Sequence, residues 1–241
     1  CSSTLVPPSY GRENIFMQGE TGHSYKLKLT LKNTATGDVL LEKILTSDNE
    51  TSEKITDFGT DDRANALLTM SSLKNAITEA PTFNINLSYL TATNEQWQIE
   101  FTTDGGKYMA ACDYGSFAAG GNEGFVDGSS ASTLASTSTG KNPIAVSAYV
   151  SRKDYTDISG KIHNNPWTEG DIYVRSGKGP TFDGRIKPDV VAPGAAVISS
   201  LNSFAAMYSV PSTDKVYSET TNDRTYYWGV GSGTSMATPA V

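Results

Sequence analysis

Strict alternation of apolar and polar residues is the feature of this sequence that most constrains its fold. Leucines alternate with lysines and threonine over residues 25–32, and comparable runs span residues 83–89 and 97–102. A period of two places one kind of side chain on each face of a strand, so each run predicts a half-buried β-strand. Short strands separated by turn residues about every ten positions predict an antiparallel β-sandwich of the jelly-roll type.

Turn residues and weaker patterns assign the segments between these runs. A Thr-Gly-Asp turn within residues 33–38 predicts a hairpin whose return strand covers residues 39–45, and another strand is expected around residues 53–58. Residues 64–80 carry apolar side chains roughly on one helical face, which favours a helix. A Gly-rich turn then precedes residues 107–112, which are expected to pair back on the strand before them.

The chain changes character after Tyr114. Residues 115–140 are rich in Gly, Ala, Ser and Thr, which predicts a loop. Continuous apolar runs over residues 143–150 and 190–199 are typical of strands buried on both faces of a parallel sheet. The carboxy-terminal half is therefore expected to form a doubly wound α/β layer, with its site at a sheet edge.

These patterns divide the chain into three predicted parts. Residues 1–21 are expected to be a leader segment, residues 22–118 a β-sandwich module and residues 119–241 an α/β domain. The net charge of −7 argues against a nucleic-acid partner held by phosphate contacts. No apolar run approaches the ~18 residues that predict a membrane span.

The last residues of the chain carry its strongest chemical signal. Residues 231–241 read Gly-Ser-Gly-Thr-Ser-Met-Ala-Thr-Pro-Ala-Val, which predicts that Ser235 lies at the start of a helix. The free N–H groups and the positive end of the helix dipole stabilise negative charge there. A serine that attacks a carbonyl needs this stabilisation, because the carbonyl oxygen becomes an oxyanion. The run Gly-Thr-Ser-Met-Ala-Thr-Pro resembles the nucleophile motif of the subtilisin-like serine proteases (subtilases).

A second motif precedes the first in the order that this family shows. Residues 176–194 contain Gly-Pro-Thr-Phe-Asp-Gly-Arg-Ile-Lys-Pro-Asp-Val-Val-Ala-Pro-Gly, which by chemistry alone predicts two turns and an extended lead into a buried strand. It also resembles the subtilase segment before the nucleophile. Over residues 140–241 the resemblance implies a partial subtilisin-like fold and peptide-bond hydrolysis through an acyl-enzyme. It implies Ser235 as nucleophile and its own N–H as one oxyanion donor. Between the motifs, residues 203–228 are interpreted as an insertion loop, either packed on the surface or touching substrate.

The base and the acid that a serine nucleophile requires are missing from this pattern. The chain contains two histidines, His23 and His163, and neither matches the family's histidine motif, so both are interpreted as surface residues. The aspartate motif is absent too. We therefore interpret the chain as a piece of a serine endopeptidase. Its triad Asp and His would come from a missing amino-terminal half or a partner chain, and the isolated chain is expected to lack proteolytic activity.

Asn122 leaves two interpretations open. Residues 118–124 read Ala-Ala-Gly-Gly-Asn-Glu-Gly and resemble the subtilase sequence whose Asn side chain completes the oxyanion hole, with one glycine added. That resemblance implies an oxyanion role for Asn122. The alternative makes residues 117–128 the closing loop of the β module.

The resemblance implies a protein or peptide substrate and a secreted or cell-surface bacterial protease. Cys1-Ser2-Ser3 would suit the mature end of a lipoprotein, and Cys1 and Cys112 are expected to be free thiols. The sequence shows no cofactor or metal site of its own, although the family resemblance admits calcium. A rival hypothesis is a non-catalytic protein whose β module binds a peptide or a glycan on a protease-like scaffold.

Overall fold

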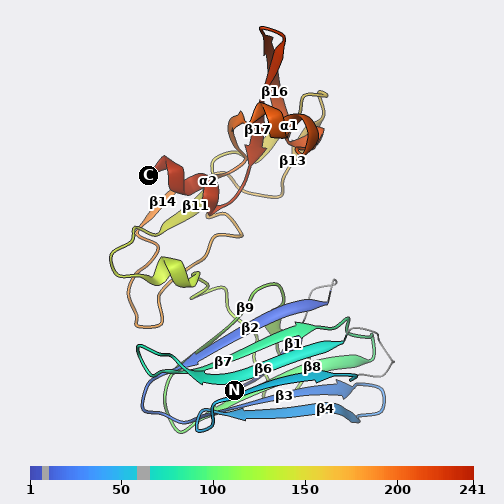
Figure 1. The fold of residues 1–241 in the computed structure, drawn as a ribbon, viewed down its shortest axis with the longest axis vertical. Coiled ribbons are helices and arrows are strands. Elements are labelled where there is room, and N and C mark those ends of the chain that lie inside the picture. Colours follow the sequence, from blue (N-terminus) through green and yellow to red (C-terminus); the bar gives the residue numbers. More distant parts are fainter. Residues whose placement is uncertain (7–10, 59–65) are drawn as a thin grey trace. The chain divides into compact units, whose positions relative to one another are not determined.

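The computed structural model describes residues 1–6, 11–58 and 66–241, without the side chains of residues 206–208. The chain forms two compact units, residues 1–129 and 130–241 (Figure 1). Each unit has a hydrophobic core of its own. No helix within the described residues has the length and apolar character needed to cross a membrane.

The first unit is a β-sandwich of two antiparallel sheets, with strand orders β10-β1-β8-β3-β4 and β5-β6-β7-β2-β9 (Figure 1). The first sheet contains Ser2–Val6 (β1), Tyr25–Asn33 (β3), Val39–Thr46 (β4), Glu95–Thr103 (β8) and Ser116–Ala118 (β10). The second contains Arg12–Gly19 (β2), Thr51–Thr56 (β5), Leu67–Lys74 (β6), Pro81–Ser88 (β7) and Tyr108–Cys112 (β9).

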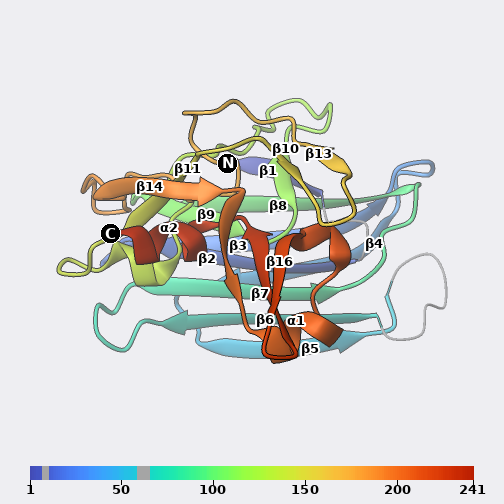
Figure 2. The same ribbon diagram turned by 90° about the horizontal axis from the view of Figure 1, so that it is seen from above.

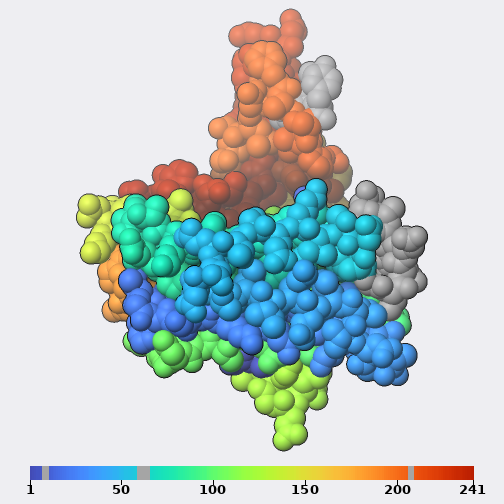
Figure 3. Space-filling model, turned by 60° about the horizontal axis from the view of Figure 1, so that its bottom comes forward, coloured from blue at the N-terminus to red at the C-terminus, as the bar shows by residue number. Residues whose placement is uncertain are grey.

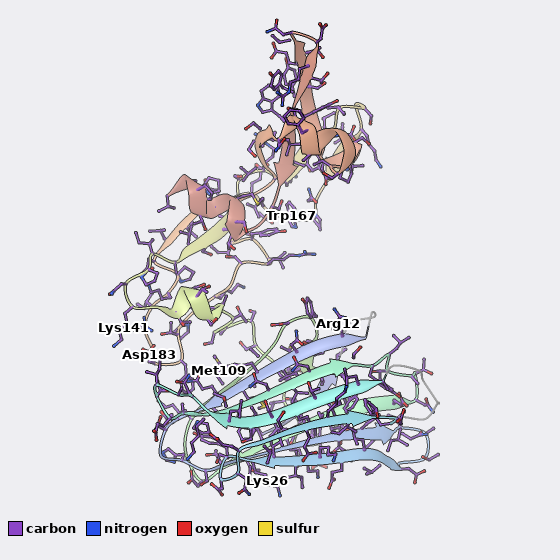
Figure 4. The ribbon with its side chains drawn as sticks, in the orientation of Figure 1. Arg12, Lys26, Met109, Lys141, Trp167 and Asp183 are labelled. Atoms are coloured by element: carbon purple, nitrogen blue, oxygen red, sulfur yellow. The ribbon has the colours of Figure 1, made fainter. Side chains whose placement is uncertain are left out.

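The alternating runs form strands as predicted. In β3, the leucines at 27, 29 and 31 are almost fully buried, while Lys26 lies on the outer side of its sheet (Figure 4). Strand β3 pairs with β4 in the expected hairpin. Figure 3 shows part of the outer surface of this unit, with the early strands in blue and cyan. Burying one face of each sheet gives a shared core that contains Phe83, Trp97 and Phe101.

The helix expected over residues 64–80 is wrong where the structure describes it. Residues 67–74 form β6, which pairs with β5 on one side and β7 on the other. Leu68, Met70 and Ser72 are buried at a period of two, so pairing between two strands overrides the weak helical pattern. Residues 64 and 65 lie outside the described residues.

The expectation of a leader over residues 1–21 is corrected as well. Strand β1 pairs with β8 and β10, and β2 pairs with β7 and β9, so most of this segment belongs to the sandwich. Ile15 and Met17 supply the alternation that identifies β2, and each is 2% exposed. Residues 107–112 were expected to pair back on the preceding strand, but β9 crosses to the other sheet and pairs with β2.

Hydrogen bonds extend the first unit past residue 118. The N–H of Val126 donates to the carbonyl of Ser2 at 2.9 Å, and that of Gly128 donates to Phe117 at 2.8 Å. The buried carboxylate of Glu13 accepts the N–H groups of Asn14, Asp113 and Tyr114, which fixes the turn after β9. Residues 119–128 are therefore the closing segment of the sandwich unit.

The two apolar runs of the second unit contain one parallel pair of strands, β11 and β14, as predicted. The expected burial on both faces is wrong for β14, because Val190 is 40% and Val191 47% exposed, and the end of the second run belongs to the antiparallel strand β15. The expected doubly wound α/β layer is not seen, because the other described sheets of this unit are antiparallel and its helices are short. Residues 203–228, interpreted as an insertion loop, instead form α1, β16 and much of β17.

The helices and strands of the second unit are Val146–Val150 (β11), Asp154–Thr156 (β12), Ile162–Asn164 (β13), Val190–Ala195 (β14), Val197–Leu201 (β15), Ser203–Tyr208 (α1), Lys215–Thr221 (β16), Arg224–Gly231 (β17) and Thr234–Ala237 (α2). Short 3-10 turns lie at Ser136–Thr139, Ser212–Asp214 and Thr238–Ala240.

Candidate active site

A short helix presents Ser235. Gly233 precedes α2 with φ of +144°, a conformation that L side chains rarely adopt. Its N–H donates to the carbonyl of Gly194 at 2.6 Å, and the hydroxyl of Ser232 accepts the N–H of Ala196 at 2.9 Å. Two hydrogen bonds thus fasten the loop before Ser235 to the end of β14.

The buried side of α2 rests on the parallel strands, beside which α2 lies in Figures 1 and 2. Ala237 is fully buried in a cluster that includes Ala148 of β11 and Ala192 of β14. Small side chains allow the helix to approach the sheet closely. A Cβ at Gly194 would lie 3.0 Å from the Gly233 carbonyl oxygen and closer still to the Ala148 methyl group. Glycine at 194 is therefore required by space.

Ser235 is exposed, and its hydroxyl has no hydrogen-bond partner among the described residues. Its N–H belongs to the first turn of α2, where N–H groups lack an acceptor four residues earlier. The N–H of Met236, by contrast, donates to the carbonyl of Gly233 at 3.0 Å. A free hydroxyl beside an unsatisfied donor is chemically suited to attack a carbonyl and to stabilise the resulting oxyanion.

The motif over residues 176–194 holds the strands beneath α2 in place. Ser176 is buried, and its hydroxyl accepts the N–H of Ala148 at 3.0 Å and bonds the hydroxyl of Ser147 at 2.7 Å. Buried Lys187 donates to the carbonyl of Pro143 at 2.8 Å and to Asp189 at 2.6 Å. These bonds hold β11 and β14 in the places against which α2 packs.

Charged turns of the same motif are paired locally. Arg185 donates to Asp183 at 2.8 Å and to the carbonyls of Thr139 and Gly140, so the neighbouring loops that carry Asp183 and Lys141 are joined (Figure 4). The Arg185 guanidinium, together with the Thr181 hydroxyl, lowers the pKa of Asp183 to about 2. The interpretation of these residues as turn and strand determinants is consistent with these contacts.

We expect Ser176→Ala to destabilise the second unit by about 2 kcal/mol, because it leaves the buried N–H of Ala148 without an acceptor. Ser147→Ala is the matched control, since it removes the same Ser–Ser bond but leaves the Ala148 N–H paired with Ser176. Urea unfolding and hydrogen exchange of the Ala148 amide measure the difference. Equal losses in the two variants would contradict the argument.

Each histidine is paired with a carboxylate of its own unit. His23 belongs to the first unit, where its Nδ1 lies 2.8 Å from Asp104. Backbone N–H donation from Ser24, and then His23, lower the pKa of Asp104. The imidazole of His163 in the second unit lies 2.8 Å from the buried carboxylate of Asp157, whose pKa is lowered chiefly by this hydrogen bond.

Asn122 belongs to the first unit, whereas Ser235 belongs to the second. The side-chain N–H₂ of Asn122 faces Thr4 and Gln96 at 3.2 Å each, and the carbonyls of Ala119 and Gly120 at 3.3 and 3.4 Å. An oxyanion donor must keep this group free for substrate. These contacts favour the closing-loop interpretation, and the oxyanion role stays a prediction.

The described residues contain no group of three or more His, Cys, Asp and Glu side chains that could hold a metal ion. Cys1 and Cys112 are free thiols, as expected. Burial, followed by the charges of Glu13 and Asp113, raises the pKa of Cys112 to about 11, so this thiol is a poor nucleophile. Calcium binding stays a prediction.

Sequence reasoning missed the residues that support Ser235. Gly194, Ser232 and Ser176 each hold the loop or the strands beneath it, yet nothing local in the sequence distinguishes them from ordinary turn residues. Their only signal was membership of the two motifs, because the partners that they contact are distant in the chain.

Comparisons with known proteins match the second unit and much of the first. The model of the subtilase family matches residues 59–241. The serine protease/ABC transporter B family protein tagD of Dictyostelium discoideum is 40% identical over 79 residues, and pyrolysin of Pyrococcus furiosus is 45% identical over 60 residues. These matches cover 30% and 24% of this chain but only 4% of each relative.

A solved structure of the CspB protease of Clostridium perfringens is similar over 99% of this chain, with a TM-score of 0.56. The sequence identity is 16%, so this likeness concerns the fold alone. The present chain covers 41% of that protein. The chain thus spans less than half of the length of each of the two relatives and of the solved protease.

Proposed function

Because this chain belongs to the subtilase family, we propose that it is part of a serine endopeptidase in which Ser235 is the nucleophile. One observation carries the proposal. Ser235 is exposed at the start of α2 with a free hydroxyl, on a loop that Gly194 and Ala196 fasten to the parallel strands. The serine-protease relatives and the solved protease with a similar fold support it.

In the proposed reaction, the Ser235 Oγ attacks the carbonyl carbon of a peptide bond while its proton passes to a histidine base. The carbonyl oxygen becomes an oxyanion that accepts a hydrogen bond from the Ser235 N–H. Collapse expels the amine, which takes the proton from the histidine, and leaves an acyl ester on Ser235. Water then hydrolyses the ester by the same proton transfers in reverse.

The histidine and its orienting aspartate would come from outside residues 1–241. Both histidines of the chain are paired with carboxylates, His23 with Asp104 and His163 with Asp157. Members of a catalytic triad act as a unit, so the chain by itself is proposed to be inactive. The remainder of a longer protease or a second polypeptide would complete the site, and secretion or surface attachment is proposed from the resemblance alone.

Labelling with a fluorophosphonate probe tests both parts of this proposal. We expect no labelling of the purified chain, and labelling when the chain is joined to, or mixed with, the segment that supplies Asp and His. Ser235→Ala is expected to abolish that labelling. Ser200→Ala is the matched control, because Ser200 is also exposed but lies within β15.

If the isolated chain were labelled and Ser235→Ala were not, Ser235 would be supported as the nucleophile. The proposed inactivity of the isolated chain would then be wrong. The base would then be sought first at His163, where Asp157 already orients the ring. If labelling persisted in Ser235→Ala, or never occurred in the completed protein, the assignment of Ser235 as the nucleophile would be wrong. That outcome would favour the rival hypothesis of a binding protein on a protease-like scaffold.

A further inference from the structure

A groove with aromatic walls lies in the second unit, and none of its lining residues has been given a role in the candidate site. Its volume is about 450 Å³, within the range of small-ligand and side-chain pockets. Its walls come from segments far apart in the sequence: the loop and strand after β11, strand β15, and the hairpin β16–β17. The groove, here named the aromatic groove, is lined by Arg152, Asp154, Tyr155, Thr156, Ile198, Val216, Tyr217 and Trp228.

Each aromatic wall is held in place by its neighbours. Tyr155 stacks on His163 with ring centroids 4.8 Å apart, and the Asp157 carboxylate lies 2.8 Å from the His163 Nε2. Tyr217 and Trp228 face each other across β16 and β17 with centroids 5.1 Å apart. These contacts fix the positions of the aromatic side chains that line the groove.

A backbone hydrogen bond joins the two walls. The N–H of Ile158, just after β12, donates to the carbonyl of Lys215 at the start of β16 at 2.8 Å. The groove nevertheless leaves apolar surface in water, since Tyr217 is 55% exposed and Ile198 is 40% exposed. Apolar surface of this kind gains free energy when a ligand covers it.

The rim offers one charge of each sign. The side chains of Arg152 and Asp154 have no hydrogen-bond or ion-pair partner among the described residues, so both are available to a ligand, although the Asp154 backbone pairs with Asn164. A guanidinium can donate to peptide carbonyls, and a carboxylate can accept from peptide N–H groups. Because the two charges cancel, the rim complements an uncharged segment of polypeptide rather than a strongly acidic or basic one.

Strand β17 connects the groove to the candidate nucleophile. Trp228 lies three residues before the end of β17 at Gly231, which corresponds to about 10 Å of strand. The chain then passes through Ser232 and Gly233 to Ser235. An extended polypeptide bound near Ser235 could therefore reach the groove with a residue several positions from its scissile bond.

We propose that the aromatic groove is an accessory substrate site that takes an aromatic side chain of the polypeptide substrate. Tyr155, Tyr217 and Trp228 would pack against that ring, while Arg152 and Asp154 bind the flanking backbone. Ring-on-ring contact and burial of Ile198 would favour it over a small or charged residue. This proposal rests on the proposed peptidase function, because that function supplies the polypeptide.

Binding to the Ser235→Ala chain tests the groove without any need for catalysis. The probes are two unstructured peptides that differ only in a central Phe or Ala, titrated by calorimetry and followed by amide NMR shifts. We expect the Phe peptide to bind roughly tenfold more tightly than the Ala peptide, with shifts at residues 155, 217 and 228. Tyr217→Ala is expected to remove that preference, because its side chain is mostly exposed and its strand pairing is retained.

Tyr226→Ala is the matched control. Tyr226 of β17 is an exposed aromatic residue, as is Tyr217 of β16, but Tyr226 does not line the groove. Equal binding of the two peptides would overturn the proposal, as would an equal loss in the Tyr226 variant. If a neutral oligosaccharide displaced the Phe peptide and shifted the amide signals of the same groove residues, the groove would be assigned to a glycan, and the proposal would be overturned. Selective binding of the Phe peptide, together with a failure of the probe to label Ser235 in the completed protein, would support the groove but overturn the proposed function.

Discussion

Gly194→Ala is expected to destabilise the second unit by about 3 kcal/mol and to displace Ser235 from its position on α2. A Cβ at this position would meet the Ala148 methyl group and lie 3.0 Å from the carbonyl of Gly233. Both neighbours belong to packed elements, β11 and the loop before α2, so neither can yield as a flexible side chain would. The strands must separate or the loop must move.

The functional consequence is expected to exceed the loss of stability. The Gly194 carbonyl accepts the N–H of Gly233, and that bond helps to set the direction from which α2 begins. A displacement of about 1 Å in a catalytic group can lower a rate roughly a hundredfold. Urea unfolding measures the first effect. The rate of fluorophosphonate labelling in the completed protein measures the second.

Gly184→Ala separates steric overlap from backbone strain. Gly184 has φ of +83° and nothing within 4 Å of a Cβ built on it, so an alanine there meets only conformational strain. That strain costs about 1 kcal/mol. We expect this control to retain normal labelling. A Gly194→Ala protein as stable and as quickly labelled as the Gly184→Ala protein would contradict the role assigned to Gly194.

Local patterns in the sequence predicted strands well where one face is buried. The alternation from Tyr25 to Lys32 and the apolar runs that became β11 and β14 each identified a strand. Sheet membership was not predictable, because β9 pairs with β2 and β1 pairs with β8 across long stretches of chain. The helix expected over residues 64–80 was wrong for the same reason, since β5 and β7 decide the conformation of β6.

The candidate site divides in a similar way. Ser235 was identified from a contiguous motif, because a nucleophile, the glycines before it and its helix are neighbours in sequence. The hydrogen bonds of Ser232 to Ala196 and of Ser176 to Ala148 join residues 36 and 28 positions apart, and no sequence period reveals such pairs. The aromatic groove could not be predicted either. Pairing of β16 with β17 brings Tyr217 opposite Trp228, but residues 203–228 were interpreted as a loop, so this pairing was not expected.

Trp97→Ala is expected to be the most destabilising single truncation in the first unit, at about 4 kcal/mol. Trp97 is fully buried at the centre of the sandwich core. Its indole makes edge contacts with Phe58 and Tyr89 at centroid distances of 5.9 and 6.0 Å. Removing it leaves a cavity between two sheets that are tied by many strand pairs, so the walls can collapse only partly. Urea unfolding followed by far-ultraviolet circular dichroism measures the loss.

Trp97→Phe distinguishes lost packing from the cost of an unpaired donor. The indole N–H has no acceptor within the described residues, and a buried unpaired donor costs about 1–3 kcal/mol. Phenylalanine removes that donor while keeping a ring against Phe58 and Tyr89, so the two effects oppose each other. We expect Trp97→Phe to lose less than half of what Trp97→Ala loses. If the two variants were equally destabilised, the indole N–H would have to be satisfied in solution, and the core around residue 97 would be less dry than its full burial implies.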